Sequence, residues 1–266
     1  MTSSDAASRG GQFMEANGVT FYYEVHGQGE PLLLLHAGSL TAEMWRPYLA
    51  AFSDRYLVII PDLPNHGRSS KPARPLSYRR MADEIVGFMQ ALHLTSPAII
   101  GFSDGGQVAL EIGVRYPALS RAIAMGGVVF RDSDASRAFV RDALGDPESP
   151  DVDPAHLART HPDWAAWLDE IYGQGGWTSL LEQLKPMWTT PLKYTANEFA
   201  SVVAPVLVFV GDRDELVPVN EAVEMFRQLP NAELAIVPDA NHGAFFSTRA
   251  GAFQAILLDF LHRHPT

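Results

Sequence analysis

The chain has 266 residues, a length that fits one large domain or one domain carrying an insertion. Apolar residues make up 47% of the sequence and charged residues 19%, which excludes a disordered chain. With 20 basic and 31 acidic residues the formal net charge is −11, so we expect neither nucleic acid nor an anionic membrane as a partner. The absence of cysteine excludes disulfide bonds, thiolate metal sites and a cysteine nucleophile.

The first residues, 1–11, are rich in serine, alanine and glycine, and we expect them to form a flexible tail. This segment lacks the apolar run of a signal peptide. No apolar run elsewhere approaches the ~18 residues that span a bilayer. We therefore expect a cytoplasmic protein.

Short apolar runs alternate with longer amphipathic stretches, a pattern typical of an α/β fold. Strands are expected, in chain order, at Val19–Val25, Leu32–Leu35, Tyr56–Ile60, Ala98–Ile100, within Arg121–Phe130, at Val206–Val210 and at Leu234–Val237. The spacing of apolar residues predicts helices at Met81–Leu92, Val108–Tyr116 and Phe253–Leu261. These elements assign residues 12–130 and 201–266 to one core.

The segment 131–200 departs from this alternation. It has no strand-like apolar run, it holds four of the five tryptophans, and it carries 12 acidic and 6 basic residues. We interpret it as a helical cap, or lid, inserted into the core, with its aromatic side chains facing an apolar pocket. A plain set of surface helices is the alternative.

The strongest motif is Gly101-Phe102-Ser103-Asp104-Gly105, a G-x-S-x-G sequence between an apolar strand and a helix. A nucleophile on so sharp a turn has a strained backbone, and glycine two residues to either side avoids steric clashes. The start of the following helix adds positive potential where an oxyanion would form. The motif therefore predicts that Ser103 is a catalytic nucleophile.

A serine nucleophile needs a base, and the base needs an acid that orients it. His242 follows the last expected strand and is the candidate base. Asp214 follows the strand before it and is the candidate acid. Asp212 and Asp132 compete for that role, although Asp212 is suited to capping its own turn.

The order serine, aspartate, histidine and the sequences around these residues resemble the α/β-hydrolase superfamily over nearly the whole chain. Beside the serine turn, the matching motifs are His36-Ala37-Gly38-Ser39, Asp62-Leu63-Pro64-Asn65-His66-Gly67-Arg68-Ser69, Gly211-Asp212-Arg213-Asp214 and Asn241-His242-Gly243. The resemblance implies an α/β-hydrolase fold: a mostly parallel eight-stranded sheet flanked by helices, with the cap inserted after the sixth strand. The chain departs from the family pattern at Ala37 and Asn65, where glycine is usual.

The same resemblance implies how the site is completed. It favours Asp214 as the acid that orients the histidine. It assigns the oxyanion hole to the backbone N–H groups of Gly38 and Asp104. It places His36 and His66 in structural turns.

Candidate substrate-binding residues lie next to these positions and in the cap: Ser39, Phe102, Asp104, Trp164, Trp167 and Trp188. The turn around Asp104 is similar to that of biphenyl-hydrolase-like amino-acid ester hydrolases, which implies that the Asp104 carboxylate binds a substrate ammonium group. Stabilisation of the helix start by the same charge is the alternative.

Together these features predict a serine hydrolase that cleaves a small carboxylic ester through an acyl-enzyme. The same three residues also serve lactonases, C–C bond hydrolases and cofactor-free perhydrolases, and the fold also occurs in ligand receptors, so these remain alternatives. A serine nucleophile argues against haloalkane dehalogenases and epoxide hydrolases, which use a carboxylate. No metal or nucleotide motif is present, so we expect no cofactor and, as partner, a small ester or lactone.

Overall fold

The computed structural model describes residues 9–131, 133–190 and 193–265. Eight strands form one sheet in the order β1-β2-β4-β3-β5-β6-β7-β8. Their bounds are β1 (Arg9–Ala16), β2 (Val19–His26), β3 (Glu30–Leu35), β4 (Tyr56–Pro61), β5 (Ala98–Phe102), β6 (Ala122–Gly126), β7 (Val206–Gly211) and β8 (Ala232–Val237). β2 pairs antiparallel with β1 and β4, and every other pair is parallel. The mostly parallel eight-stranded α/β-hydrolase fold is thus confirmed.

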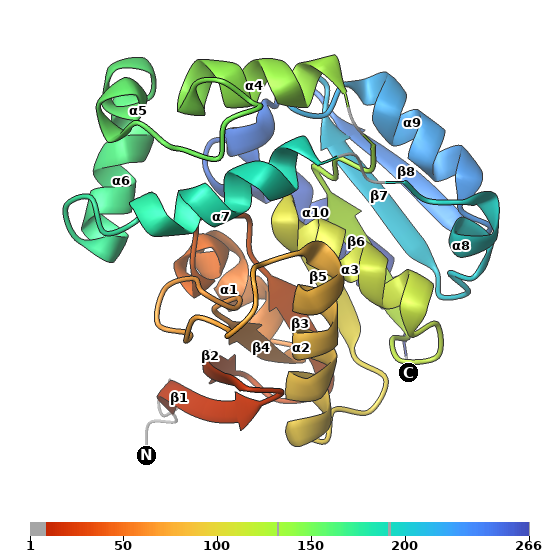
Figure 1. Cartoon of the computed structure of the whole chain (residues 1–266). Helices are drawn as coiled ribbons and strands as arrows, with labels where there is room; N and C mark the ends of the chain where they lie inside the picture. Colours follow the sequence, from red (N-terminus) through yellow and green to blue (C-terminus); the bar gives the residue numbers. More distant parts are fainter. Residues whose placement is uncertain (1–8, 132, 191–192, 266) are drawn as a thin grey trace.

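Helices cover both faces of the sheet (Figure 1). One face packs against α1 (Arg46–Ser53) and α10 (Ala250–Arg263). The other packs against α2 (Tyr78–Ala91), α3 (Asp104–Arg115) and α9 (Val219–Gln228). Two short 3₁₀ helices, η1 (Ala42–Trp45) and η2 (His242–Phe246), follow β3 and β8. Because successive strand residues point to opposite faces, the apolar run of β3 serves both cores, with Leu33 in one and Leu32 in the other.

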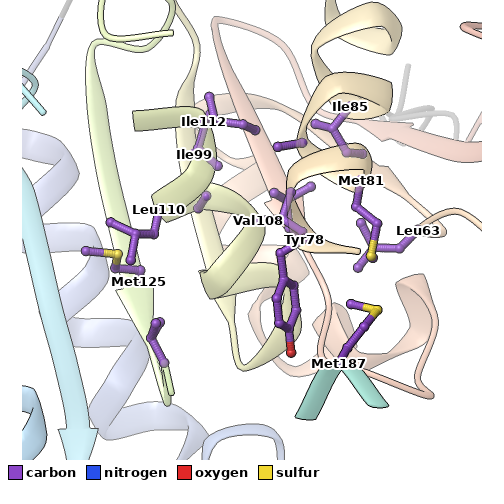
Figure 2. Close-up of a cluster of buried hydrophobic side chains, with 14 of the residues drawn as sticks. Leu63, Tyr78, Met81, Ile85, Ile99, Val108, Leu110, Ile112, Met125 and Met187 are labelled. Carbon is purple, nitrogen blue, oxygen red and sulfur yellow. The ribbon is translucent and has the colours of Figure 1, made fainter. Parts of the chain in front are cut away.

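Helices α2 and α3 show why the sequence pattern folds in this way. The Ser77 side chain accepts a hydrogen bond from the Arg80 N–H and so caps the start of α2. Met81 and Ile85 of α2, four residues apart, lie on one face and pack toward Val108 of α3 (Figure 2). Burial of each such side chain stabilises the fold by about 1.5–3 kcal/mol, so these helices are held firmly on the sheet.

Between β6 and β7 the chain leaves the sheet. It forms α4 (Asp134–Leu144), α5 (Pro154–Thr160), α6 (Pro162–Tyr172), α7 (Thr178–Thr189) and α8 (Ala196–Ala200), and the described residues of this stretch contain no strand. Helices α4–α7 gather at the top of the view in Figure 1, and we call residues 134–189 the helical insertion. Its buried Lys185 donates hydrogen bonds to the carbonyls of Leu144 and Asp151 and so joins α7 to the α4–α5 connection. Helix α8 contacts α3 and α9 instead.

The N-terminal region differs from the expectation. Strand β1 is not indicated by the apolar pattern, and it begins at Arg9, inside the segment expected to be a tail. Arg9 pairs with Val25 of β2, and the pairing is irregular up to Gln12. Pairing with β2 outweighs the low strand propensity of Gly10 and Gly11. Residues 1–8 lie outside the described residues. No helix in the described ranges is both long and apolar enough to cross a membrane.

Candidate active site

Ser103 lies on a strained turn between β5 and α3. Its φ of 53° and ψ of −119° are unfavourable for a residue with a side chain. Its N–H donates to the Gly126 carbonyl at 2.8 Å, which ties the turn to β6. A Cβ atom on Gly101 would lie 2.1 Å from the Gly105 carbonyl oxygen, and one on Gly105 would lie 2.2 Å from that of Leu35. Only glycine fits at either position, as the G-x-S-x-G motif predicts.

His242 and Asp214 meet at the ends of neighbouring strands. The imidazole Nδ1 donates to Asp214 Oδ2 at 2.8 Å, and the Asp214 side chain is only 2% exposed. The other Asp214 oxygen accepts the N–H groups of Leu216 at 3.0 Å and Val217 at 2.9 Å. The His242 backbone N–H donates to Glu215 Oε2 at 3.1 Å. Both the carboxylate and the loop that carries the imidazole are therefore held in place.

This pairing leaves Nε2 as the imidazole nitrogen that can accept a proton. Burial alone would lower the pKa of His242, but the carboxylates of Asp214, Glu215 and Asp104 together outweigh burial and raise that pKa above its ordinary value, with Asp214 the strongest of the three. Asp212, the competing acid, accepts the N–H of Ala240 at 3.2 Å and so holds its own turn. Asp132, the third candidate, lies outside the described residues.

Ser103 and His242 line one cavity of about 350 Å³. Five of the predicted substrate-binding residues also line it: Ser39, Asp104, Trp164, Trp167 and Trp188. Most of the wall is apolar, and much of it comes from the helical insertion. The structure therefore brings together residues from the turn between β5 and α3, the loop after β3, the loop after β8 and the insertion.

Phe102 is the exception among the predicted substrate-binding residues. It is 2% exposed and stacks on Phe245 with ring centroids 4.2 Å apart and planes 3° apart. Its ring centroid lies 4.8 Å from that of His242. Because β5 is buried on both faces, this side chain packs into the core rather than into the cavity. Phe102 is not among the residues that line the cavity, and its ring instead packs beside the imidazole.

The Asp104 carboxylate joins the predicted oxyanion residues to two helices. A Cβ atom on Gly38 would lie 2.2 Å from Asp104 Oδ2, so glycine is required there. The Tyr78 hydroxyl donates to Oδ1 at 2.8 Å, and the Trp188 indole N–H lies 3.0 and 3.1 Å from the two oxygens. Tyr78 extends from the start of α2 toward α7, which carries Met187 (Figure 2). Burial raises the pKa of Asp104, and these two hydrogen bonds partly oppose that rise.

The insertion also holds the loop after β3. Ser39 has a φ of 62° and is 1% exposed. The Trp164 indole N–H donates to Ser39 Oγ at 3.3 Å. The Tyr172 hydroxyl donates to the Ser39 carbonyl at 3.1 Å and accepts the Gly67 N–H at 3.2 Å. Two backbone segments are expected to form the oxyanion hole, and Ser39 lies on one and Asp104 on the other. Three aromatic residues of the insertion, Trp164, Tyr172 and Trp188, thus contact these segments.

Comparison with known proteins agrees with this geometry. Residues 32–255 match the model of the alpha/beta hydrolase family. The chain belongs to this family. The hydrolase is 29% identical to "Putative carbamate hydrolase RutD" of Caulobacter sp. (strain K31), over 90% of this chain and 95% of that protein. It is 25% identical to serine hydrolase BPHL of Mus musculus, over 92% and 84% respectively.

Among solved structures, the hydrolase is similar to the meta-cleavage product hydrolase from Pseudomonas fluorescens IP01 (CumD). The TM-score is 0.81 at 20% identity, over 96% of this chain and 98% of the other. That likeness shows the shared fold. The family match and the curated relatives support hydrolysis as the activity of the chain.

The two histidines expected in structural turns have that role in the hydrolase. His36 Nε2 accepts the Leu63 N–H at 2.8 Å, so Nδ1 donates to the Ala37 carbonyl. Burial lowers the pKa of His36 to about 4 and that of His66 to about 3, which keeps both rings neutral. Asn65, a departure from the family pattern, has a φ of 65°, a region that asparagine tolerates better than most residues. Ala37, the other departure, is not among the residues with positive φ.

The charged groups around the cavity are mainly acidic. Among the described residues that line it are Asp104, Asp163 and Glu215, and none of the lining residues in this set is lysine or arginine. In the part of the chain that the structure describes, no three histidine, aspartate or glutamate side chains are grouped so as to hold a metal ion. The cavity of the hydrolase is thus apolar with a negative bias.

Sequence reasoning missed several residues of the site: Tyr78, Gln107, Phe139, Tyr172, Glu215 and Phe246. One of them carried a usable signal. Gln107 follows Ser103 by four residues, directly before the predicted helix Val108–Tyr116, and residues four apart lie on the same helical face once that helix begins at Asp104. The others reach the site through tertiary packing, which local spacing does not encode.

Proposed function

We propose that this hydrolase cleaves a small carboxylic ester through an acyl-enzyme formed on Ser103. The proposal is carried by one observation: His242, which is hydrogen-bonded to the buried Asp214, lines the same cavity as a serine held on a strained turn. A serine on such a turn, a histidine and a buried carboxylate are the three groups that acyl transfer by a serine nucleophile requires.

In the proposed reaction, the Ser103 oxygen attacks the ester carbonyl while His242 Nε2 removes the serine proton. The same imidazole then gives that proton to the leaving alcohol as the ester C–O bond breaks. Asp214 keeps the Nδ1 proton in place and stabilises the imidazolium. Water, deprotonated by His242, then attacks the acyl-enzyme and releases the acid and the free serine. The raised pKa of His242 suits a group that must hold a proton between these steps.

The oxyanion of each tetrahedral intermediate would be held by the backbone N–H groups of Gly38 and Asp104. Such a donor contributes about 3 kcal/mol to transition-state stabilisation. The start of α3 adds its positive end to the same point. The close approach of the Asp104 carboxylate to Gly38, which leaves no room for a Cβ atom there, supports this role because the two residues lie side by side.

We propose further that the helical insertion is the cap over this site. Its aromatic residues supply much of the cavity wall and contact both predicted oxyanion segments. The cavity volume of about 350 Å³ lies at the lower end of the usual range for small-molecule sites. We therefore expect short and medium acyl groups to fit. The acidic groups on the wall favour an uncharged or cationic substrate over an anionic one.

Hydrolysis of nitrophenyl esters from acetyl to decanoyl, by the native protein and by Ser103→Ala, tests the proposal. We expect activity that peaks at short or medium acyl groups and is lost in Ser103→Ala, together with stoichiometric labelling of Ser103 by a fluorophosphonate. Equal rates for the two proteins on every ester would reject the ester hydrolase. Lactones, β-diketones and peroxide-dependent acyl transfer would then be tested on the same pair of proteins.

A further inference from the structure

Gln107 belongs to the cavity but has no part in the reaction described above. It lies one helical turn after Ser103, with its backbone N–H donating to the Ser103 carbonyl at 2.9 Å. It lines the catalytic cavity and is only 2% exposed. A polar side chain so buried at a binding site has to be explained by its hydrogen bonds.

A chain of three side chains determines which way the Gln107 amide faces. The Tyr194 hydroxyl lies 2.8 Å from Glu111 Oε1 and 2.6 Å from Gln107 Nε2. A carboxylate only accepts hydrogen bonds, so the single hydroxyl proton of Tyr194 is donated to Glu111. The Tyr194 oxygen must then accept from Gln107, which requires the amide nitrogen to face Tyr194.

The amide oxygen of Gln107 is left without a partner by this arrangement. Within the described part of the chain, Gln107 Oε1 is buried and accepts no hydrogen bond. Tyr194 is not among the lining residues of the catalytic cavity, so the amide nitrogen is bonded to a residue outside that wall and the oxygen is the amide atom that remains for a bound molecule. A buried acceptor without a donor costs free energy, and a ligand that supplies the donor recovers that cost.

Two other acceptors on the same wall, Asp104 and Ser39, already have protein donors. Asp104 accepts from Tyr78 and Trp188, and the Ser39 hydroxyl oxygen accepts from Trp164. A donor group on a bound molecule would compete with protein donors at those positions. At Gln107 it would meet an acceptor that no protein donor occupies.

We propose that Gln107 is a specificity residue of this site, whose Oε1 accepts a hydrogen bond from a hydroxyl or amide N–H group of the substrate. The inference rests on the proposed ester hydrolysis and narrows its substrate class to esters that carry such a donor close to the carbonyl. The hydrogen-bond chain through Tyr194 and Glu111 is the device that keeps the oxygen, rather than the nitrogen, available to the substrate.

Matched esters that differ only by a hydroxyl in place of a methyl group test this proposal. Three pairs place the group at different positions: nitrophenyl lactate and isobutyrate, nitrophenyl β-hydroxybutyrate and isovalerate, and hydroxyethyl and propyl butyrate. For each pair we compare kcat/KM of the hydroxyl ester with kcat/KM of the methyl ester. In at least one pair we expect this ratio to be about tenfold lower in Gln107→Met than in the native protein, because one hydrogen bond to an otherwise unpaired group is lost. Gln90→Met, an exposed change on α2, is the control and keeps the native ratio. Equal ratios in the native protein and Gln107→Met for all three pairs would overturn the proposal.

The Tyr194→Phe variant gives a readout that a merely structural role of Gln107 would not produce. Without the tyrosine oxygen, the Gln107 amide is free to rotate and present its nitrogen to the cavity. We expect the preference for the hydroxyl ester to shrink and the rate on the corresponding methoxy ester, which only accepts, to rise relative to the methyl ester. If Tyr194→Phe hydrolyses the hydroxyl, methoxy and methyl esters in the same order of rates as the native protein, the hydrogen-bond chain through Tyr194 does not orient the Gln107 amide.

Calorimetric binding separates this inference from the proposed function. The uncharged amides lactamide and β-hydroxybutyramide, and their methyl counterparts isobutyramide and isovaleramide, are titrated into the native protein, Gln107→Met and Gln107→Glu. If the native protein hydrolyses no ester faster than Ser103→Ala does, the proposed function fails. A hydroxyl preference in binding that Gln107→Met removes would still support the assignment of Gln107. Equal affinities for hydroxyl and methyl amides in all three proteins would reject it.

Discussion

Replacing Asp214 with asparagine tests the acid–base arrangement of the site most directly. The change preserves the shape of the side chain but removes the negative charge that faces His242 at 2.8 Å. The two side chains are 2% and 13% exposed, so the pair lies between protein interior and solvent. For such a pair an effective dielectric constant of about 20 applies, and unit charges about 4 Å apart attract by about 4 kcal/mol. The imidazolium of the proposed transition state would lose that stabilisation.

A loss of about 4 kcal/mol corresponds to a decrease of about three orders of magnitude in rate. The assay is kcat on the best nitrophenyl ester, with Asp212→Asn as the matched control. Asp212 is exposed and accepts one backbone N–H, a role that asparagine can also fill. We therefore expect Asp212→Asn to lower kcat by less than about threefold. Comparable losses in the two variants, or more than a tenth of native kcat in Asp214→Asn, would refute the assignment of the acid.

Asp214→Asn and Asp212→Asn are also expected to differ in the pH dependence of their activity. Activity requires neutral His242, so the rate of the native protein rises with pH through a pKa above the ordinary value of 6.5. Removing the Asp214 charge takes away the strongest of the influences that raise the pKa of the imidazole, so that pKa falls. The acid limb of the kcat/KM profile is thus expected to move to lower pH in Asp214→Asn and to stay in place in Asp212→Asn. A limb that stays in place in both variants would show that it does not report on this pair.

Three further changes test the walls of the site. Gly38→Ala places a Cβ atom 2.2 Å from the Asp104 carboxylate, and we expect kcat to fall about 100-fold, as for loss of one oxyanion donor. The control is Ala37→Gly, a change at the preceding residue, and a native kcat in Gly38→Ala would contradict the role of Gly38. Trp164→Ala enlarges the cavity and should move the optimum of the ester series to longer acyl groups, whereas an unchanged optimum would place the acyl chain elsewhere. Asp104→Asn keeps the shape of the side chain and removes its charge, so kcat/KM should fall more for α-amino esters than for neutral esters if the carboxylate binds an ammonium group; equal losses would remove that role.

The residues that could be predicted from the sequence are those whose function depends on a local turn. The strained serine turn needs its glycines within two positions, so the pattern around Ser103 is visible in five consecutive residues. Asp214 and His242 each follow an apolar strand directly, and parallel strands bring such loops to one edge of the sheet.

The residues that could not be predicted depend on packing between distant segments. Tyr78 reaches Asp104 because α2 packs against α3, which no spacing in the chain reveals. Its position next to Ser103 suggests that Phe102 lies in the pocket. A strand buried on both faces, however, directs alternate side chains into opposite cores, and the Phe102 side chain lies in one of them. Strand β1 was missed because its partner β2, rather than its own glycine-containing sequence, stabilises it.

The point at which the helical insertion joins the sheet has a consequence for how proteins of this kind diverge. The chain leaves the sheet after β6 and returns at β7, and these two strands are hydrogen-bonded neighbours, with Ile123 opposite Val206. The sheet therefore fixes the positions of both ends of the excursion, Gly126 of β6 and Val206 of β7, whatever lies between them. Because the entropy of closing a loop grows only slowly with its length, helices can be added, lost or exchanged here at small cost to folding. Mutations in this one stretch can thus change the shape of the binding pocket while the nucleophile, base and acid keep their positions.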